Sequence, residues 1–214
     1  MNEIKDLIKT YKIRKARIKS RLADFKKIYA KNSARWFEEL CFCLCTPQSK
    51  AVNCNKAVCS LRRTKTLFEG SAEKIAGQLC GLVRFHNNKS RYIVQARKTF
   101  YKNTKYGIKE RIKSFQDEKK ARQWLVENIK GISLKEASHF LRNIGMGDDL
   151  AIIDRHILAN LKRYGAIKEL PKTITPKQYF SLEEKMRRFS RKIKIPMAEL
   201  DLLFWSNQTG HIFK

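Results

Sequence analysis

Apolar residues recur at helical spacing along most of the chain, and this pattern constrains the fold more than any other feature of the sequence. In "SARWFEELCFCLC" the apolar residues fall three and four positions apart, and a helix there should end before Pro47. No run alternates apolar and polar residues long enough to indicate a sheet, and the 214 residues include only 9 Gly and 4 Pro. The sequence therefore predicts an all-α protein.

Composition points to a folded protein that meets a polyanion. Hydrophobic residues make up 43% of the chain, which excludes wholesale disorder, while 47 Lys+Arg against 20 Asp+Glu give a formal net charge of +27. Nucleic acid is the first partner to expect from such a charge, and an anionic membrane surface is the second. The N-terminal segment lacks the uninterrupted apolar stretch of a signal peptide, and no uncharged run approaches the roughly 18 residues of a membrane span. We therefore expect an intracellular protein.

Six cysteines lie in the first half of the chain, and their spacing contains no CxxC pair. Zinc and iron–sulfur sites usually use closely paired cysteines, so free or buried thiols are the expectation here. The sequence thus predicts no metal and no cofactor.

Helix start and stop signals divide the chain further. We expect a basic amphipathic helix over residues 2–30 and two helices over about residues 50–105, broken by "LVRFHNNKSRYI". A long loop should cover residues 166–176. Proline is tolerated at the first helical position, so two more helices should open at Thr175-Pro176 and Ile195-Pro196.

The stretch "EKKARQWLVENIKGISLKEASHFLRN" predicts two helices joined by a tight hairpin. Gly131 stands where a helix-terminating glycine is wanted, and Ser133 with Glu136 forms a capping box that starts the second helix. The backbone N–H groups of such a hairpin form a phosphate site that ignores base sequence.

Lys135 lies in the first turn of this second helix, where an acidic residue would be more usual. It shares a face with His139 and Arg142, and this face should be basic. A lysine among other cations near a helix N-terminus favours the free amine, which a Schiff-base nucleophile requires. The other reading, a phosphate-binding or solvated lysine, remains open on chemistry alone.

Asp154 is a single carboxylate inside the apolar run "LAIIDRHIL". It should cap the helix that ends near Gly165. Capping is compatible with catalysis, because a carboxylate fixed by backbone bonds can stabilise a cationic sugar transition state or accept a proton from an attacking amine.

"KGISLKEASHFLRN", followed nineteen residues after Lys135 by Asp154 in "IIDRHI", resembles the helix–hairpin–helix–Gly/Pro–Asp superfamily of DNA base-excision glycosylases. The proline usual before the first hairpin glycine is replaced by Lys130. The resemblance implies that Lys135 marks a bifunctional glycosylase/lyase, that Asp154 is the essential aspartate, and that His156 binds backbone phosphate.

The resemblance covers nearly the whole chain. "CTPQS", "RFHNNKSRYI", "DRHI" and "ELDLLFWSNQTGHIFK" look like the second, archaeal-type family of 8-oxoguanine DNA glycosylase/AP lyases. The chain has no four-cysteine pattern of the endonuclease III-like branch and no extra N-terminal domain like that of the eukaryotic enzyme.

The resemblance also assigns residues that would contact the DNA around a flipped nucleotide. It places Gln48 in the gap left by the extruded base and Phe85 as a wedge near the orphaned cytosine, with Arg84 nearby. Gln48 as a cap for the following helix and Phe85 as a core residue are the alternative readings.

The last helix and the chain end suggest a base pocket. Asp201 and Trp205 lie on one stripe, where Trp205 could stack on a purine or pack in the core. In the resembling family the C-terminal lysine takes part in distinguishing the lesion from guanine, and this chain ends in Lys214; a frayed tail is the alternative. His139 would face either the base or the backbone.

Together these features predict two helical lobes with an active-site cleft between them. Residues 31–147 would form a helical-barrel lobe ending in the helix–hairpin–helix, and residues 1–30 plus 148–214 would form the second lobe. The expected protein is a monomer that flips 8-oxoguanine out of double-stranded DNA, excises it through a lysine Schiff base and nicks the strand by β-elimination. The alternatives are a glycosylase/lyase for another lesion, such as an oxidised pyrimidine, and a non-catalytic helix–hairpin–helix DNA-binding protein.

Overall fold

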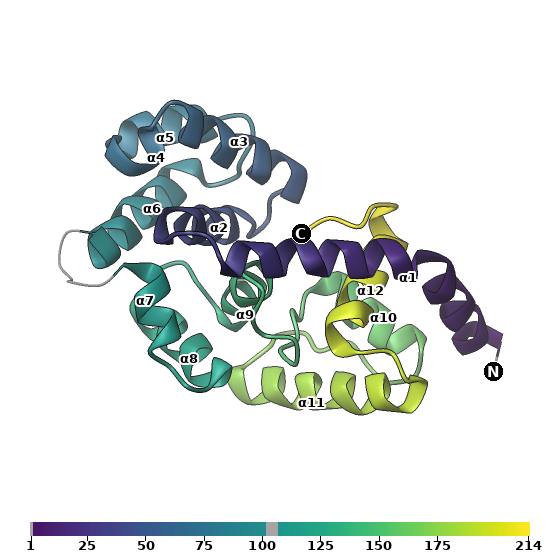
Figure 1. The fold of residues 1–214 in the computed structure, drawn as a ribbon. Helices are drawn as coiled ribbons and strands as arrows, with labels where there is room; N and C mark the ends of the chain where they lie inside the picture. The colour runs from purple at the N-terminus through teal and green to yellow at the C-terminus, as the bar shows by residue number, and fades with distance from the viewer. Residues whose placement is uncertain (1, 102–106) are drawn as a thin grey trace.

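All the regular secondary structure in residues 2–101 and 107–214, which the computed structural model describes, is α-helical. The prediction of an all-α protein is therefore confirmed. Figure 1 shows the arrangement of the helices, with bounds α1 (Asn2–Tyr29), α2 (Ser33–Cys45), α3 (Ala51–Arg63), α4 (Thr66–Glu69), α5 (Ala72–Leu79), α6 (His86–Tyr101), α7 (Ile108–Lys113), α8 (Glu118–Asn128), α9 (Leu134–Asn143), α10 (Arg155–Arg163), α11 (Pro176–Ile193) and α12 (Met197–Thr209).

Buried apolar side chains form two clusters. The first gathers around α2, whose Trp36, Phe37 and Leu40 are fully buried, and also takes side chains from α3 and from α5 to α9. The second combines the inner face of α1 with α10, α11 and α12. In Figure 1 the long α1 runs across the middle of the molecule, between α2 with its neighbours and the group of α10, α11 and α12. Helix α9 contributes to both clusters, because Leu134 belongs to the second and Phe140 to the first.

Most of the helix boundaries follow the predicted signals. Ser133 and Glu136 form the expected capping box, and Asp154 is the N-cap of α10. Thr175 caps α11, with proline following it in the first turn. Pro196 differs slightly, because it occupies the N-cap position of α12 and not the first helical position.

The prediction for residues 50–105 was partly wrong. The described part of this range contains four helices, α3 to α6, where two were expected; its predicted end falls in residues 102–106, outside the described residues. The supposed break "HNNKSRYI" is the first half of α6, and the real break is the short turn that ends at Phe85. The polar Lys89 and Ser90 are the first buried residues of α6, so the apolar repeat begins only with Ile93.

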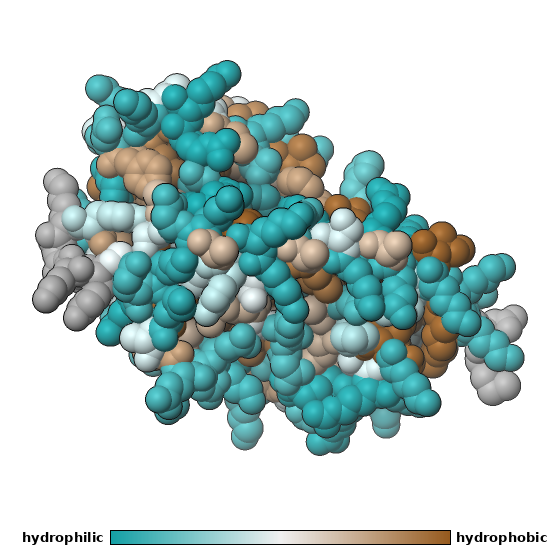
Figure 2. Space-filling model, in the orientation of Figure 1, coloured by the Kyte–Doolittle hydropathy of each residue, from teal (hydrophilic) through white to brown (hydrophobic). Residues whose placement is uncertain are grey.

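One side of the molecule can be seen to be mostly polar. Hydrophilic side chains cover most of the side seen in Figure 2, in keeping with the net charge of +27. None of the helices in the described residues combines the length and the apolar character that crossing a membrane requires.

Candidate active site

Helices α8 and α9 form the predicted hairpin. Gly131 has φ of +89°, and the Tyr92 ring lies only 2.4 Å from where a Cβ atom would stand, so a side chain is excluded for two reasons. The glycine comes one residue later than predicted, because Ile129 is the C-cap of α8. Gly131 and Ser133 are both exposed, which leaves the hairpin backbone open to a ligand.

Lys135 is partly exposed in the first turn of α9. Its side chain is 27% exposed, and its Nζ lies 2.7 Å from Oε1 of the buried Glu136. This ion pair was not expected from the sequence. A lysine attacks as the free amine, so Nζ must leave this ion pair before it can act as a nucleophile.

The face of α9 that was predicted to be basic is largely buried. His139 and Arg142 are 8% and 5% exposed, and the ring of His139 meets that of Phe42 edge-on at 5.5 Å. Burial, together with the charges of Arg142, Lys135 and Lys214, holds the pKa of His139 well below its usual value, so the imidazole is neutral. Its Nε2 is buried without a hydrogen-bond partner among the described residues.

Asp154 uses one carboxylate oxygen for structure. Its Oδ1 accepts hydrogen bonds of 2.8 Å from the backbone N–H groups of His156 and Ile157. No described residue donates to Oδ2. Asp154 is half-buried, so capping fixes the carboxylate and leaves its second oxygen available.

Asp201 on α12 is buried and paired with Arg142, which joins the last helix to α9. Burial raises the pKa of Asp201 to about 6, the negative charge of nearby Asp154 adds to the rise, and Arg142 opposes it. Asp201 thus pairs with Arg142 of α9 and is also under the influence of the charge of Asp154, which caps α10.

The chain end is held in place. Nζ of Lys214 donates to both carboxylate oxygens of Glu39, at 2.9 and 3.2 Å, and lies 4.6 Å from the centre of the Phe42 ring. Glu39 is fully buried in α2 and also accepts from Arg35 and Asn143. The frayed-tail reading of Lys214 is therefore wrong.

Gln48 and Phe85 are both exposed and both have left-handed backbone conformations, with φ of 54° and 58°. Phe85 is 52% exposed, so it is not a core residue, and the guanidinium of Arg84 lies 5.5 Å from its ring centre. Gln48 does not cap α3, because Lys50 is the N-cap. Both alternative readings are therefore wrong.

Comparisons with known proteins identify the family of the chain. Residues 18–195 match the family model described as 8-oxoguanine DNA glycosylase. The chain belongs to the 8-oxoguanine DNA glycosylase family. It is 45% identical over 214 residues to an 8-oxoguanine DNA glycosylase/AP lyase of Fusobacterium nucleatum, covering 100% of this chain and 97% of that protein. The corresponding protein of Methanocaldococcus jannaschii is 39% identical, with 100% of this chain and 94% of that protein covered.

Solved structures of the family share the fold over the full chain. The M. jannaschii 8-oxoguanine glycosylase/lyase in complex with a 15-mer DNA containing 8-oxoguanine superposes with a TM-score of 0.90 at 38% identity, and each chain is covered to 100%. The 8-oxoguanine DNA glycosylase of Thermotoga maritima gives 0.88 at 32% identity, covering 100% of this chain and 99% of that one.

In this family member, most predicted site residues fall into two groups. The first group is linked by charge and consists of Lys135, His139, Asp154, Asp201 and Lys214. The charges of Lys135, Lys214 and Arg142 act on His139, Arg142 pairs with Asp201, and the charge of Asp154 acts on Asp201. The second consists of the turns that carry Gln48, Arg84 and Phe85. Trp205 and His156 are half-buried, so each has a face open to a ligand.

Two residues that matter here were missed. Glu39 left a signal, since two adjacent acidic residues interrupt the apolar run "RWFEELCFCLC" and therefore required partners. Lys89 left none, because it stands among polar residues and reads as a solvated lysine.

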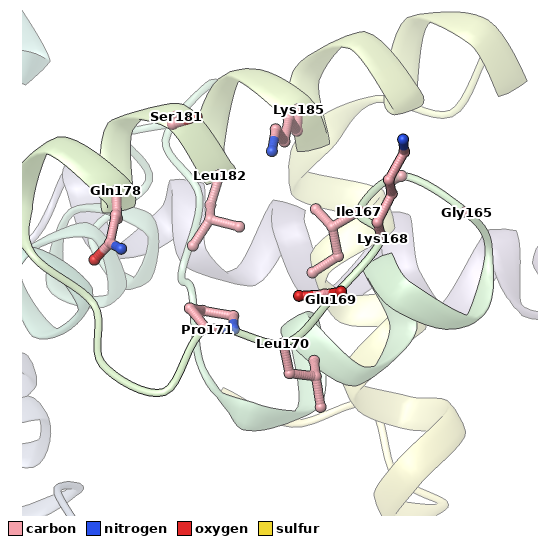
Figure 3. Close-up of a pocket in the computed structure, with 11 residues that line it drawn as sticks. Gly165, Ile167, Lys168, Glu169, Leu170, Pro171, Gln178, Ser181, Leu182 and Lys185 are labelled. Atoms are coloured by element: carbon pink, nitrogen blue, oxygen red, sulfur yellow. The ribbon is translucent and has the colours of Figure 1, made fainter.

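Other features lie apart from this site. All six cysteines are free, and the described residues contain no group of three or more His, Cys, Asp or Glu that could hold a metal ion. Figure 3 shows an open hollow between the loop at Ile167–Pro171 and the α11 residues Gln178, Leu182 and Lys185, and none of the predicted site residues lines it.

Proposed function

We propose that the chain excises 8-oxoguanine from double-stranded DNA and then cleaves the strand as an AP lyase, with Lys135 as nucleophile and Asp154 as its partner. The activity follows from family membership and from the printed names of full-length relatives. Two features of the structure support these residues: Lys135 is a partly exposed lysine in a capped first turn, and Asp154 is a fixed carboxylate with one oxygen free.

The reaction begins with a proton leaving the Lys135 ammonium, and the free oxygen of Asp154 can accept it or stabilise positive charge on the sugar. The Nζ lone pair forms a bond to C1′ while the bond from C1′ to the base breaks, and the base leaves with that electron pair. Opening of the sugar gives a Schiff base between Nζ and C1′. Loss of a C2′ proton then expels the 3′ phosphate oxygen, which cuts the strand.

Recognition of the base is assigned to the more buried residues of the site. In 8-oxoguanine N7 carries a proton, whereas in guanine N7 is an acceptor, so discrimination needs an acceptor at that position. We propose that the base pocket is formed by Lys214, the exposed part of Trp205, the buried His139, and Asp201 behind them.

Contacts with the DNA backbone and the distorted duplex involve a second set of residues. They are Gln48, Arg84, Phe85, Gly131, Ser133 and His156. We further propose that residues 31–147 and residues 1–30 plus 148–214 act as two lobes around the DNA, that the protein works as a monomer, and that it acts inside the cell.

Borohydride trapping on a duplex containing 8-oxoguanine tests the catalytic assignment. The wild-type protein should give a covalent adduct and Lys135→Gln none, whereas Asp154→Asn should slow excision by at least about a hundredfold. An adduct that survives Lys135→Gln would reject Lys135 as the nucleophile. Trapping on an oxidised pyrimidine but not on 8-oxoguanine would favour the other lesion class, and no adduct on either would favour a DNA-binding protein without activity.

A further inference from the structure

Lys89 is a buried lysine bound by neutral groups. It lies in the first turn of α6 and is 4% exposed. Its Nζ donates to the backbone carbonyls of Cys45 at 2.8 Å and Pro47 at 2.6 Å, and to Oγ of Ser49 at 3.1 Å. Three donors thus meet three acceptors, all of them at the end of α2 or in the turn that follows it.

The same residue is also bonded to the turn that carries Phe85. The backbone N–H of Lys89 donates to the Phe85 carbonyl at 3.0 Å, as the first turn of α6 closes. A second link runs beside it, because the N–H of Arg84 donates to Oγ of Ser49 at 3.0 Å. Lys89 and Ser49 therefore tie the turn at Gln48 to the turn at Phe85.

Both turns contain a strained residue. Gln48 and Phe85 adopt a left-handed backbone conformation that side chains with a Cβ atom rarely take, and both side chains are exposed. Such conformations persist where the surroundings hold them, and they are concentrated at functional sites. The bonds from Lys89 supply that support here.

Lys89 is also linked electrostatically to the first turn of α9. Burial lowers the pKa of Lys89, the negative charge of Glu136 opposes this, and the positive charge of Lys135 adds to it. Burial of an ammonium among neutral acceptors costs desolvation free energy. The presence of a lysine here therefore indicates a role beyond packing.

We propose that Lys89 is a positioning residue for nucleotide extrusion: it holds the turns of Gln48 and Phe85 together in the conformation that fills the duplex once the damaged nucleotide has left it. This rests on the proposed function, in which Gln48 and Phe85 enter the DNA. Pre-organised turns lose less conformational entropy on insertion, so the extruded state is more populated.

The test uses two duplexes, one with 8-oxoguanine opposite cytosine and one with a preformed abasic site, which has no base to unstack. Lys89→Met should slow single-turnover excision of 8-oxoguanine by about 30-fold, while strand cleavage at the abasic site should stay within about threefold of wild type. The fluorescence of 2-aminopurine placed beside the lesion should rise less on binding, because extrusion is impaired. Lys98→Met is the matched control, since Lys98 is an exposed lysine on the same helix and its loss removes the same charge.

Equal losses on both duplexes, or a normal 2-aminopurine signal, would overturn the proposal, because Lys89 would then support only the fold. Unchanged excision would overturn it as well. If Lys89→Met does not fold, Ser49→Ala keeps the lysine with its two carbonyl bonds and removes the bonds that Oγ of Ser49 accepts from Lys89 and from the Arg84 N–H. It should slow excision alone by about fivefold. An equal loss on both duplexes, or no loss, in Ser49→Ala would overturn the proposal as well. The proposed function is judged separately, because its failure appears in the wild-type protein, as no excision and no borohydride adduct.

Discussion

Two lysines, the buried Lys89 and the partly buried Lys214, contact α2, and they are held in opposite ways. Lys214 binds the carboxylate of Glu39 in the middle of the helix, inside a cluster of charges that includes Arg35 and the nearby Arg142–Asp201 pair. Lys89 binds carbonyl and hydroxyl groups at the end of the helix, and none of its hydrogen-bond partners is charged. We call the first the ionic site and the second the neutral site.

The difference shows how the same side chain serves two purposes. In the ionic site each charge compensates another, so removal of one leaves its partner buried without compensation. In the neutral site the ammonium supplies directional hydrogen bonds, which hold a backbone conformation. The ionic site should therefore dominate stability and acid dependence, while the neutral site should affect extrusion, with a smaller effect on stability and little on acid dependence.

Glu39→Gln should have the largest effect on stability. The substitution leaves Lys214 without a counter-ion and weakens the pairing of Arg35, which should lower the free energy of unfolding by about 4 kcal/mol. Chemical denaturation measures this, with Glu169→Gln as control because Glu169 is exposed. A loss as small as that of the control would show that the Lys214 end simply moves into solvent, and the ionic site would then contribute nothing to the fold.

Acid dependence should separate the two sites next. The pKa of Asp201 is raised from 3.8 to about 6, so the folded protein keeps a proton that the unfolded chain releases. Its contribution to stability is therefore fully present below about pH 4 and is lost as the pH rises through 6, by on the order of 3 kcal/mol.

Unfolding titrations between about pH 4 and pH 7 measure this contribution. The free energy of unfolding of the wild type minus that of Asp201→Asn should fall across this range. The same difference taken with Lys89→Met should be nearly constant, because the groups that bind Lys89 do not titrate there. If the difference for Lys89→Met changed with pH and the difference for Asp201→Asn did not, the acid dependence would belong to the neutral site and not to the ionic site.

Deletion of Lys214 should change specificity more than it changes catalysis. Without the terminal lysine the preference for 8-oxoguanine over guanine should fall by about tenfold, whereas strand cleavage at an abasic site should be retained. The ratio of single-turnover excision rates on matched duplexes measures the effect. Extension of the chain beyond Lys214 should act in the same direction, and an unchanged ratio in both variants would remove Lys214 from the base pocket.

The sequence predicted local features better than it predicted long-range ones. Capping signals at Ser133 and Asp154 depend on neighbouring residues, so the helix starts could be read directly. Glu39 and Lys214 are 175 positions apart in the sequence, and no local pattern predicts that they pair. Likewise the spacing of His139 and Arg142 gave their shared face correctly, but a basic residue is buried or exposed according to what packs against it. The burial of Arg142 depends on its pairing with Asp201, which is distant in the sequence.

Arg84→Ala should have the smallest effect of all, on the exposed edge of the neutral site. The guanidinium of Arg84 lies over the Phe85 ring, but both side chains are exposed to water, where such a contact contributes only about 0.5 kcal/mol. Excision of 8-oxoguanine should therefore slow by only about twofold. Arg63→Ala controls for the loss of one exposed positive charge. A tenfold loss for Arg84→Ala, with none for the control, would mean that the guanidinium of Arg84 holds Phe85 in place. The role assigned to the buried Lys89 would then belong to Arg84.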